Sequence, residues 1–180
     1  MKGFTREHTE FSLCGLNCLL CTMQVGGYCP GCGGGPGNQS CAIARCSLDK
    51  GGYAFCSDCS SYPCARYDKF DSADSFVPHS RRAADLDRAR ELGLDTYIGE
   101  LSAKRAILDK LLASYNDGRR KTFYCAAVYL LSLENLQSVV ARLEGQPECS
   151  VKERAVAAVK LLQGAADGHG VCLKLKKKKG

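Results

Sequence analysis

Apolar side chains recur every three or four residues from about residue 83 onward, the spacing that places them on one face of an α-helix. Five segments show this pattern: residues 86–92, 98–115, 123–131, 136–143 and 151–162. The third is apolar almost all round, which is typical of a helix buried on every side. The sequence therefore predicts a mainly α protein, with a bundle of about five helices in a domain over residues 68–166.

Local signals predict where these helices begin and end. Gly93 ends the first segment and Gly145 ends the fourth, while Ser150 and Glu153 form a capping box at the start of the fifth. We expect the fifth helix to end at Gly164. The polar stretch before residue 13 predicts a flexible N-terminus over 1–12, and the Gly- and Lys-rich end predicts a disordered tail over 167–180.

Residues 13–67 form a separate zone in which no helical or strand periodicity is sustained. Ten of the 13 cysteines lie here, among many glycines: Cys14, Cys18, Cys21, Cys29, Cys32, Cys41, Cys46, Cys56, Cys59 and Cys64. A segment of this kind buries too little apolar area to fold alone, which is the usual reason that a small module binds a metal ion. We therefore expect a small, irregular, metal-bound module packed on the helical bundle.

Whether the cysteines bind metal or form disulfides depends on the cellular compartment of the protein. The N-terminus has no signal-peptide pattern, and no run approaches the roughly 20 apolar residues that span a bilayer. We therefore expect a cytoplasmic protein with no membrane association, whose thiols stay reduced and are free to bind metal. Cys125 lies in the most apolar segment and reads as a small buried hydrophobe, whereas Cys149 and Cys172 read as spare thiols.

The spacing of the ten cysteines suits ligation by pairs. Cys29-Pro-Gly-Cys32-Gly has the form of the knuckle found in zinc ribbons and rubredoxins, where Pro and Gly shape a turn that points both sulfurs at one ion. With the pair Cys18/Cys21 it could close one tetrahedral site. A second site could draw on Cys41, Cys46, Cys56, Cys59 and Cys64, with Cys14 as an alternative ligand for either site.

Zinc is the expected metal, because closed four-cysteine sites are usually structural zinc sites. An iron–sulfur cluster is the alternative, since it uses the same thiolates and the spacing does not separate the two. The C-x3-C-x2-C spacing at residues 14–21 also occurs in radical-SAM enzymes. Those enzymes continue with alternating strands and helices, whereas seven more cysteines and then only helical patterns follow here.

The motifs C-G-L-N-C-x2-C, C-x-G-C, C-x-I-x2-C and F-C-x2-C-x2-Y-P-C follow one another over residues 14–64. In this order the chain resembles a family of small prokaryotic Cys-rich proteins that is known only as a domain of unknown function. Residues 115–121 also look like longer members of that family. The resemblance implies a metal-binding protein of unassigned activity, and it carries no catalytic residues that could be transferred.

Charge and polar residues narrow the function. The net charge of +6 reflects five lysines in residues 174–179, and residues 1–64 carry four basic and four acidic groups, so nucleic acid is a disfavoured partner. His8, His79 and His169 are isolated and predict surface positions, and no catalytic triad or carboxylate pair can be placed. We expect a non-enzymatic binding or scaffold protein with structural zinc. The alternative is an iron–sulfur protein for electron transfer or redox sensing, or one that supports an enzyme. The partner, for which a protein is the expected class, and the oligomeric state stay open.

Overall fold

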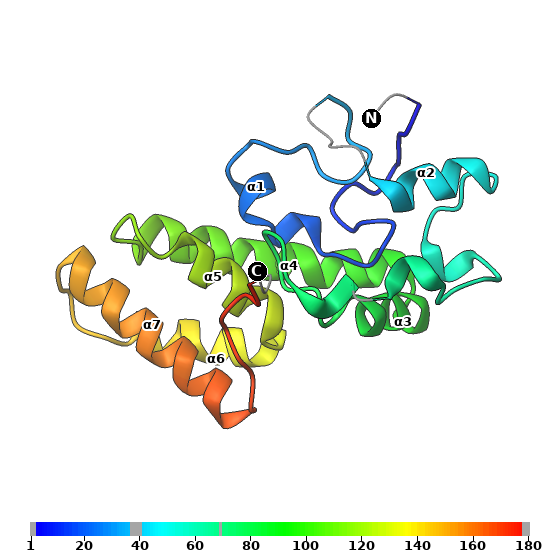
Figure 1. Cartoon of the computed structure of the whole chain (residues 1–180). Coiled ribbons are helices and arrows are strands. Elements are labelled where there is room, and N and C mark those ends of the chain that lie inside the picture. Colours follow the sequence, from blue (N-terminus) through cyan, green and yellow to red (C-terminus); the bar gives the residue numbers. More distant parts are fainter. Residues whose placement is uncertain (1–2, 37–40, 69, 178–180) are drawn as a thin grey trace.

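The computed structural model describes residues 3–36, 41–68 and 70–177, and within these ranges the chain is mainly helical and contains no β-strand. The predicted bundle of five helices is confirmed. Its members are α3 (Arg82–Leu92), α4 (Leu94–Ser114), α5 (Lys121–Leu130), α6 (Leu133–Glu144) and α7 (Val151–Gly168). Helix α4 packs against each of the other four. In Figure 1 it runs across the middle of the molecule, with the Cys-rich segment on one side and α6 and α7 on the other. No helix of the described chain is both long and apolar enough to cross a membrane.

Most helix boundaries follow the predicted signals. Gly93 separates α3 from α4 with a φ of +81°, a conformation that side chains with a Cβ rarely adopt. Ser150 caps α7, and its hydroxyl oxygen accepts the Glu153 amide hydrogen as the capping box requires. The predicted end of this helix at Gly164 is wrong, because α7 continues to Gly168. One glycine costs a helix only about 1 kcal/mol, and burial of Ala166 against the bundle sustains the last turn.

Both chain ends are in contact with the rest of the molecule where the structure describes them. Arg6 donates from its guanidinium to the carbonyls of Phe11 and Ala54, at 2.7 and 3.0 Å, within the stretch expected to be flexible. In the stretch expected to be disordered, Leu173 is buried. The backbone N–H of Lys176 donates to the Asp74 carboxylate, and the backbone carbonyl of Lys176 accepts the Asp74 amide hydrogen. Residues 1–2 and 178–180 of these two segments lie outside the described residues.

The Cys-rich zone contains short helical pieces joined by turns. They are the 3-10 turns η1 (Cys18–Leu20), η2 (Cys56–Asp58) and η3 (Ala65–Tyr67), and the helices α1 (Thr22–Val25) and α2 (Ala42–Asp49). One more 3-10 turn, η4 (Phe70–Ser72), follows just after the zone. Helix α2 has no counterpart in the sequence analysis. It buries Ile43, Ala44 and Ser47, which are too few positions for a recognisable stripe.

The main core does not stop at the predicted module boundary. Phe11 and Leu20, both fully buried, belong to the same apolar cluster as Tyr97 of α4 and Tyr129 of α5. A second, smaller cluster is formed by the Cys-rich zone together with one residue of the N-terminal segment. It contains Phe4, Leu13, Cys14, Ile43, Ala44 and Tyr67. The Cys-rich segment is thus partly integrated into the bundle and partly built around a core of its own.

Candidate metal centres

Five cysteines line one cavity of about 170 Å³ beside the bundle. We call them the inner thiol group: Cys14, Cys18, Cys29, Cys32 and Cys41. Phe4, Leu13, Ile43 and Ala44 complete its largely apolar wall. The cavity therefore gathers thiols from residues that lie up to 27 positions apart in the chain, from Cys14 to Cys41.

Close backbone approach shapes the knuckle of this group. Gly31 has a φ of +88°, and a Cβ there would lie 2.3 Å from the Thr9 carbonyl oxygen, so only glycine fits without a shift. The same carbonyl accepts the Cys32 amide hydrogen at 3.0 Å. The Cys29-Pro-Gly-Cys32 segment is thus held against the N-terminal segment. The tight turn itself spans Gly31–Gly34, where the Gly34 amide donates to the Gly31 carbonyl at 3.2 Å.

Burial raises the pKa of three inner thiols, those of Cys14, Cys18 and Cys32. It moves the pKa of Cys14 to about 12. Hydrogen-bond donors act in the opposite direction, because they stabilise a thiolate. The Ser12 hydroxyl lies 3.2 Å from the Cys14 sulfur, and backbone hydrogen bonds reach Cys18 from Cys32 and Cys32 from Leu13.

Four further cysteines line a second cavity, of about 640 Å³. We call them the outer thiol group: Cys46, Cys56, Cys59 and Cys64. The pKa of Cys56 is raised to about 11, mainly by burial and to a smaller extent by the other three thiols of the group, which lie near it. The cavity wall also carries two cationic side chains, Lys50 and Arg66, and no Asp or Glu is among the described residues that line it.

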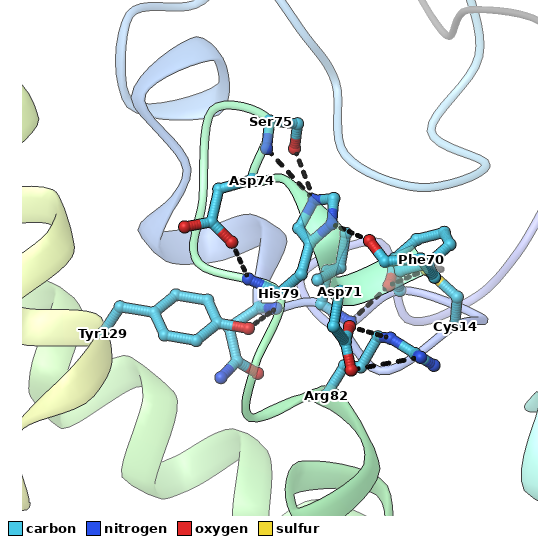
Figure 2. A network of polar contacts seen from close by, with 11 residues as sticks. Cys14, Phe70, Asp71, Asp74, Ser75, His79, Arg82 and Tyr129 are labelled. Carbon is cyan, nitrogen blue, oxygen red and sulfur yellow. Dashed lines mark hydrogen bonds and ion pairs between the residues drawn. The ribbon is translucent and has the colours of Figure 1, made fainter. Parts of the chain in front are cut away.

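One buried hydroxyl in the outer cavity lacks a partner. Tyr67 is 9% exposed, and its hydroxyl faces the Cys56 thiol without a hydrogen bond of normal geometry to any described group. The Arg82 guanidinium lies 4.1 Å above the Tyr67 ring and 4.5 Å above Phe70, and it forms an ion pair with Asp71 at 2.7 Å (Figure 2). The tyrosine is thus fixed from α3 while its hydroxyl points at a candidate ligand.

The thiols line shared walls and do not yet surround a common centre. Among the described residues, no three Cys, His, Asp or Glu side chains form a group that could hold a metal ion. Ligation would therefore require sulfurs of one group to move to roughly 2.3 Å from an ion. Comparisons with protein family models, with curated proteins and with solved structures found no match. The family resemblance accordingly stays a prediction.

The structure divides the ten cysteines differently from the sequence. Cys41 was expected with the second site, yet it lines the inner cavity, and Cys14 joins it there. Cys21, the expected partner of Cys18, lies outside both cavities and packs against the main core near buried Cys125. Cys149 and Cys172 are exposed, as expected of spare thiols.

A polar network that the sequence analysis missed ties the inner group to the bundle. Asn17, next to Cys18, donates to the Asp85 carboxylate at 3.1 Å and accepts the Tyr97 hydroxyl at 2.9 Å. Its backbone N–H points to the Tyr129 hydroxyl at 3.4 Å. Burial raises the pKa of Asp85 to about 6, although nearby Arg81 opposes that shift. No sequence signal identifies an isolated Asn as the centre of such a network.

His79 is buried, so its predicted surface position is wrong. Its ring nitrogens meet the Ser75 hydroxyl at 2.9 Å and the Phe70 carbonyl at 3.1 Å, and its backbone N–H donates to Asp74 (Figure 2). These contacts occupy both ring nitrogens. His79 therefore orders the loop before α3, and it lines neither thiol cavity.

Proposed function

We propose that the Cys-rich segment binds two metal ions of thiophilic character, one at each thiol group, and that zinc is the metal. The observation that carries the proposal is the sorting of nine of the ten N-terminal cysteines into two cavities, five in one and four in the other. Each set offers at least the four sulfur ligands of a tetrahedral zinc site.

The surroundings of each group fit metal-bound thiolates. At the inner group, backbone hydrogen bonds already reach the sulfurs of Cys18 and Cys32, as hydrogen bonds around metal–thiolate centres do. At the outer group, the Tyr67 hydroxyl would gain a hydrogen-bond acceptor if Cys56 became a thiolate. Burial disfavours free thiolates at Cys14, Cys18 and Cys32 of the inner group and at Cys56 of the outer group, and a divalent cation would compensate that cost.

Metal binding would serve the fold before any other role. The segment that carries Cys14 and Cys18 also supplies Phe11 and Leu20 to the main core, so an ion at the inner group would hold part of that core. The proposed protein is accordingly a metal-stabilised binding or scaffold protein, with the outer cavity of about 640 Å³ as a candidate binding surface.

A specific observation favours a second candidate at the outer group. Its cavity of about 640 Å³ is far larger than a single ion needs, and four cysteine thiolates are also the ligand set of iron–sulfur clusters. An iron–sulfur cluster there would assign the protein to electron transfer or redox sensing.

Metal analysis of the full chain, purified without oxygen and under reducing conditions, tests both candidates. We expect about two zinc ions per chain and no visible colour, whereas a cluster would give iron, sulfide and absorption near roughly 400 nm. Cys59→Ser should remove about one ion from the four-thiol outer group. Cys18→Ser/Cys32→Ser should remove about one ion from the inner group, which would keep four thiols after a single replacement. Cys21→Ser and Cys149→Ser are the matched controls and should keep the full content. Protein that contains no metal would contradict the proposal.

A further inference from the structure

Leu13 connects the two thiol groups through its backbone. A backbone hydrogen bond joins Leu13 to the sulfur of Cys32, an inner thiol, and its carbonyl accepts the amide hydrogen of Cys56, an outer thiol, at 2.9 Å. The Leu13 side chain is 2% exposed and contributes to the walls of both cavities. A shift of this one residue therefore moves the surroundings of both groups.

Helix α2 forms a second connection. Cys41, the residue before its first turn, belongs to the inner group, whereas Cys46 lies within the helix and belongs to the outer group. Ile43, between them, lines both cavities. Because a hydrogen-bonded helix moves largely as a unit, a displacement of Cys41 toward an ion also displaces Cys46.

We infer that metal binding at the inner and outer thiol groups is cooperative, with Leu13 and helix α2 as the elements that couple the two sites. This inference rests on the proposed function. Neither group already forms a metal site among the described residues, so its sulfurs must move when an ion binds. The first ion fixes Leu13 and α2, and the second ion then binds to a site whose ligands are already partly ordered.

The size of the effect follows from the range of coupling between sites. Coupled sites in proteins change each other's affinity by about 5- to 150-fold, and the change is reciprocal. The two sites share Leu13 and helix α2, and both cavities are lined by the second apolar cluster, so we expect a change in affinity of about tenfold. The inner site should therefore bind about tenfold more tightly when the outer site is full, and the outer site should gain the same factor.

Cobalt(II) titration of the metal-free full chain measures this factor, because cobalt bound to thiolates absorbs visible and near-ultraviolet light. The variant Cys56→Ser/Cys59→Ser gives the affinity of the inner site alone, and Cys18→Ser/Cys32→Ser gives that of the outer site alone. In the wild-type chain, the product of the two association constants should exceed the product of these separate constants about tenfold.

A second pair of variants keeps every thiol, so it tests the coupling even if the cysteine variants fold poorly. Leu13→Ala removes the side chain that both cavity walls share but keeps the two backbone hydrogen bonds, so it should weaken the coupling and make the titration curve less steep. Leu162→Ala, at a fully buried site in α7, should leave the curve steep. Equal products of constants, or equal loss of steepness in both leucine variants, would overturn the coupling and leave the two sites standing. The absence of cobalt–thiolate absorption in the wild-type chain would overturn both proposals.

Discussion

The inner and outer thiol groups contain similar ligands in different surroundings. The inner group lines about 170 Å³ walled by the second apolar cluster and is bound to α3 and α4 through Asn17. The outer group lines about 640 Å³ and meets α3 through Tyr67 and Arg82. Closed metal sites are typical of structural roles, and sites that retain free space are typical of functional ones. If the proposed metal sites form, this comparison favours a structural role for the inner group and exchange with other molecules at the outer one.

The largest effect that separates the groups should come from removing ligands from each. Structural zinc can contribute on the order of 10 kcal/mol, similar to the roughly 5–15 kcal/mol that stabilises a whole domain. Cys18→Ser/Cys32→Ser should therefore lower the melting temperature of the whole helical signal and reduce soluble yield. Cys59→Ser should mainly loosen residues 50–64 and leave most of the helix intact.

Circular dichroism on heating, combined with limited proteolysis, measures this difference. Cys149→Ser serves as the control, because that thiol is exposed and outside both cavities. If Cys18→Ser/Cys32→Ser and Cys59→Ser melt alike, the inner group does not hold the main core, and the proposed division of roles is wrong.

The next largest effect is the pH dependence of stability that comes from Asp85, in the network that ties the inner thiol group to the bundle. Burial raises the pKa of Asp85 from its ordinary value of 3.8 to about 6, so the folded state binds this proton more tightly than the unfolded state does. The charged carboxylate thus lowers stability above pH 6, and this penalty disappears as the pH falls through about 6 toward 3.8. The full difference corresponds to about 3 kcal/mol.

Urea unfolding of the wild-type chain and of Asp85→Asn, at a series of pH values, isolates this contribution. The Asn variant lacks the titrating group, so the unfolding free energy of the wild type should rise relative to it by up to about 3 kcal/mol as the pH is lowered. A difference that stays constant across this window would show that Asp85 does not titrate in the folded protein as the buried network requires.

A smaller effect should come from the contact that fixes the outer cavity to the bundle. The Arg82 side chain is 6% exposed and pairs with Asp71, and its guanidinium also stacks on Tyr67 and Phe70. Arg82→Met should cost about 2 kcal/mol, because it leaves Asp71 without its partner and removes the stacking.

Arg88→Met is the matched control on the same helix, since the pair Arg88–Glu100 is well exposed and should contribute less than about 1 kcal/mol. Chemical unfolding measures both losses, and alkylation of Cys56 reports on the outer cavity. Only Arg82→Met should speed that alkylation. Equal losses in the two variants would mean that the stacking on Tyr67 does not stabilise the outer side.

Periodicity predicted the half of the molecule in which local sequence determines structure. The five bundle helices each carry their own apolar face and their own stop or cap, such as Gly93 and the box from Ser150 to Glu153. The grouping of the cysteines depended instead on the path of the chain. Helix α2 separates Cys41 from Cys46 although only four residues lie between them, and no pattern of spacing reveals that.

The contacts that hold the two thiol groups against the bundle could not be predicted from the sequence either. The Asn17 network and the Arg82 stack each join residues more than ten positions apart, by hydrogen bonds or ring contacts that leave no periodic trace. Gly31 is an intermediate case. The sequence predicted its place in the Cys29-Pro-Gly-Cys32 motif. Only the three-dimensional structure shows that it lies close to the Thr9 carbonyl.

The smallest expected effect comes from removing the Tyr67 hydroxyl, which should stabilise the metal-free chain and weaken the metal-bound one. Without metal, the Tyr67 hydroxyl is buried with no hydrogen-bond partner among the described residues, and such a group costs roughly 1–3 kcal/mol. Tyr67→Phe should therefore stabilise the metal-free chain by about 1 kcal/mol, because the ring and its stacking on Arg82 remain. With metal bound, the same variant loses a hydrogen bond to the Cys56 thiolate, and loss of such a contact weakens metal binding by about tenfold.

Chemical unfolding of the metal-free protein measures the effect on stability. Competition with cobalt on the metal-bound protein measures the effect on metal affinity. Tyr62→Phe is the control, since Tyr62 lines the same cavity and its ring meets Tyr67 edge-on. It should change the cobalt affinity far less, because the hydroxyl that faces Cys56 belongs to Tyr67. If Tyr67→Phe destabilises the metal-free chain and leaves cobalt affinity unchanged, the hydroxyl is satisfied in some other way. The outer cavity would then lose the feature that most specifically points to a bound thiolate, while the case for the inner group would be unaffected.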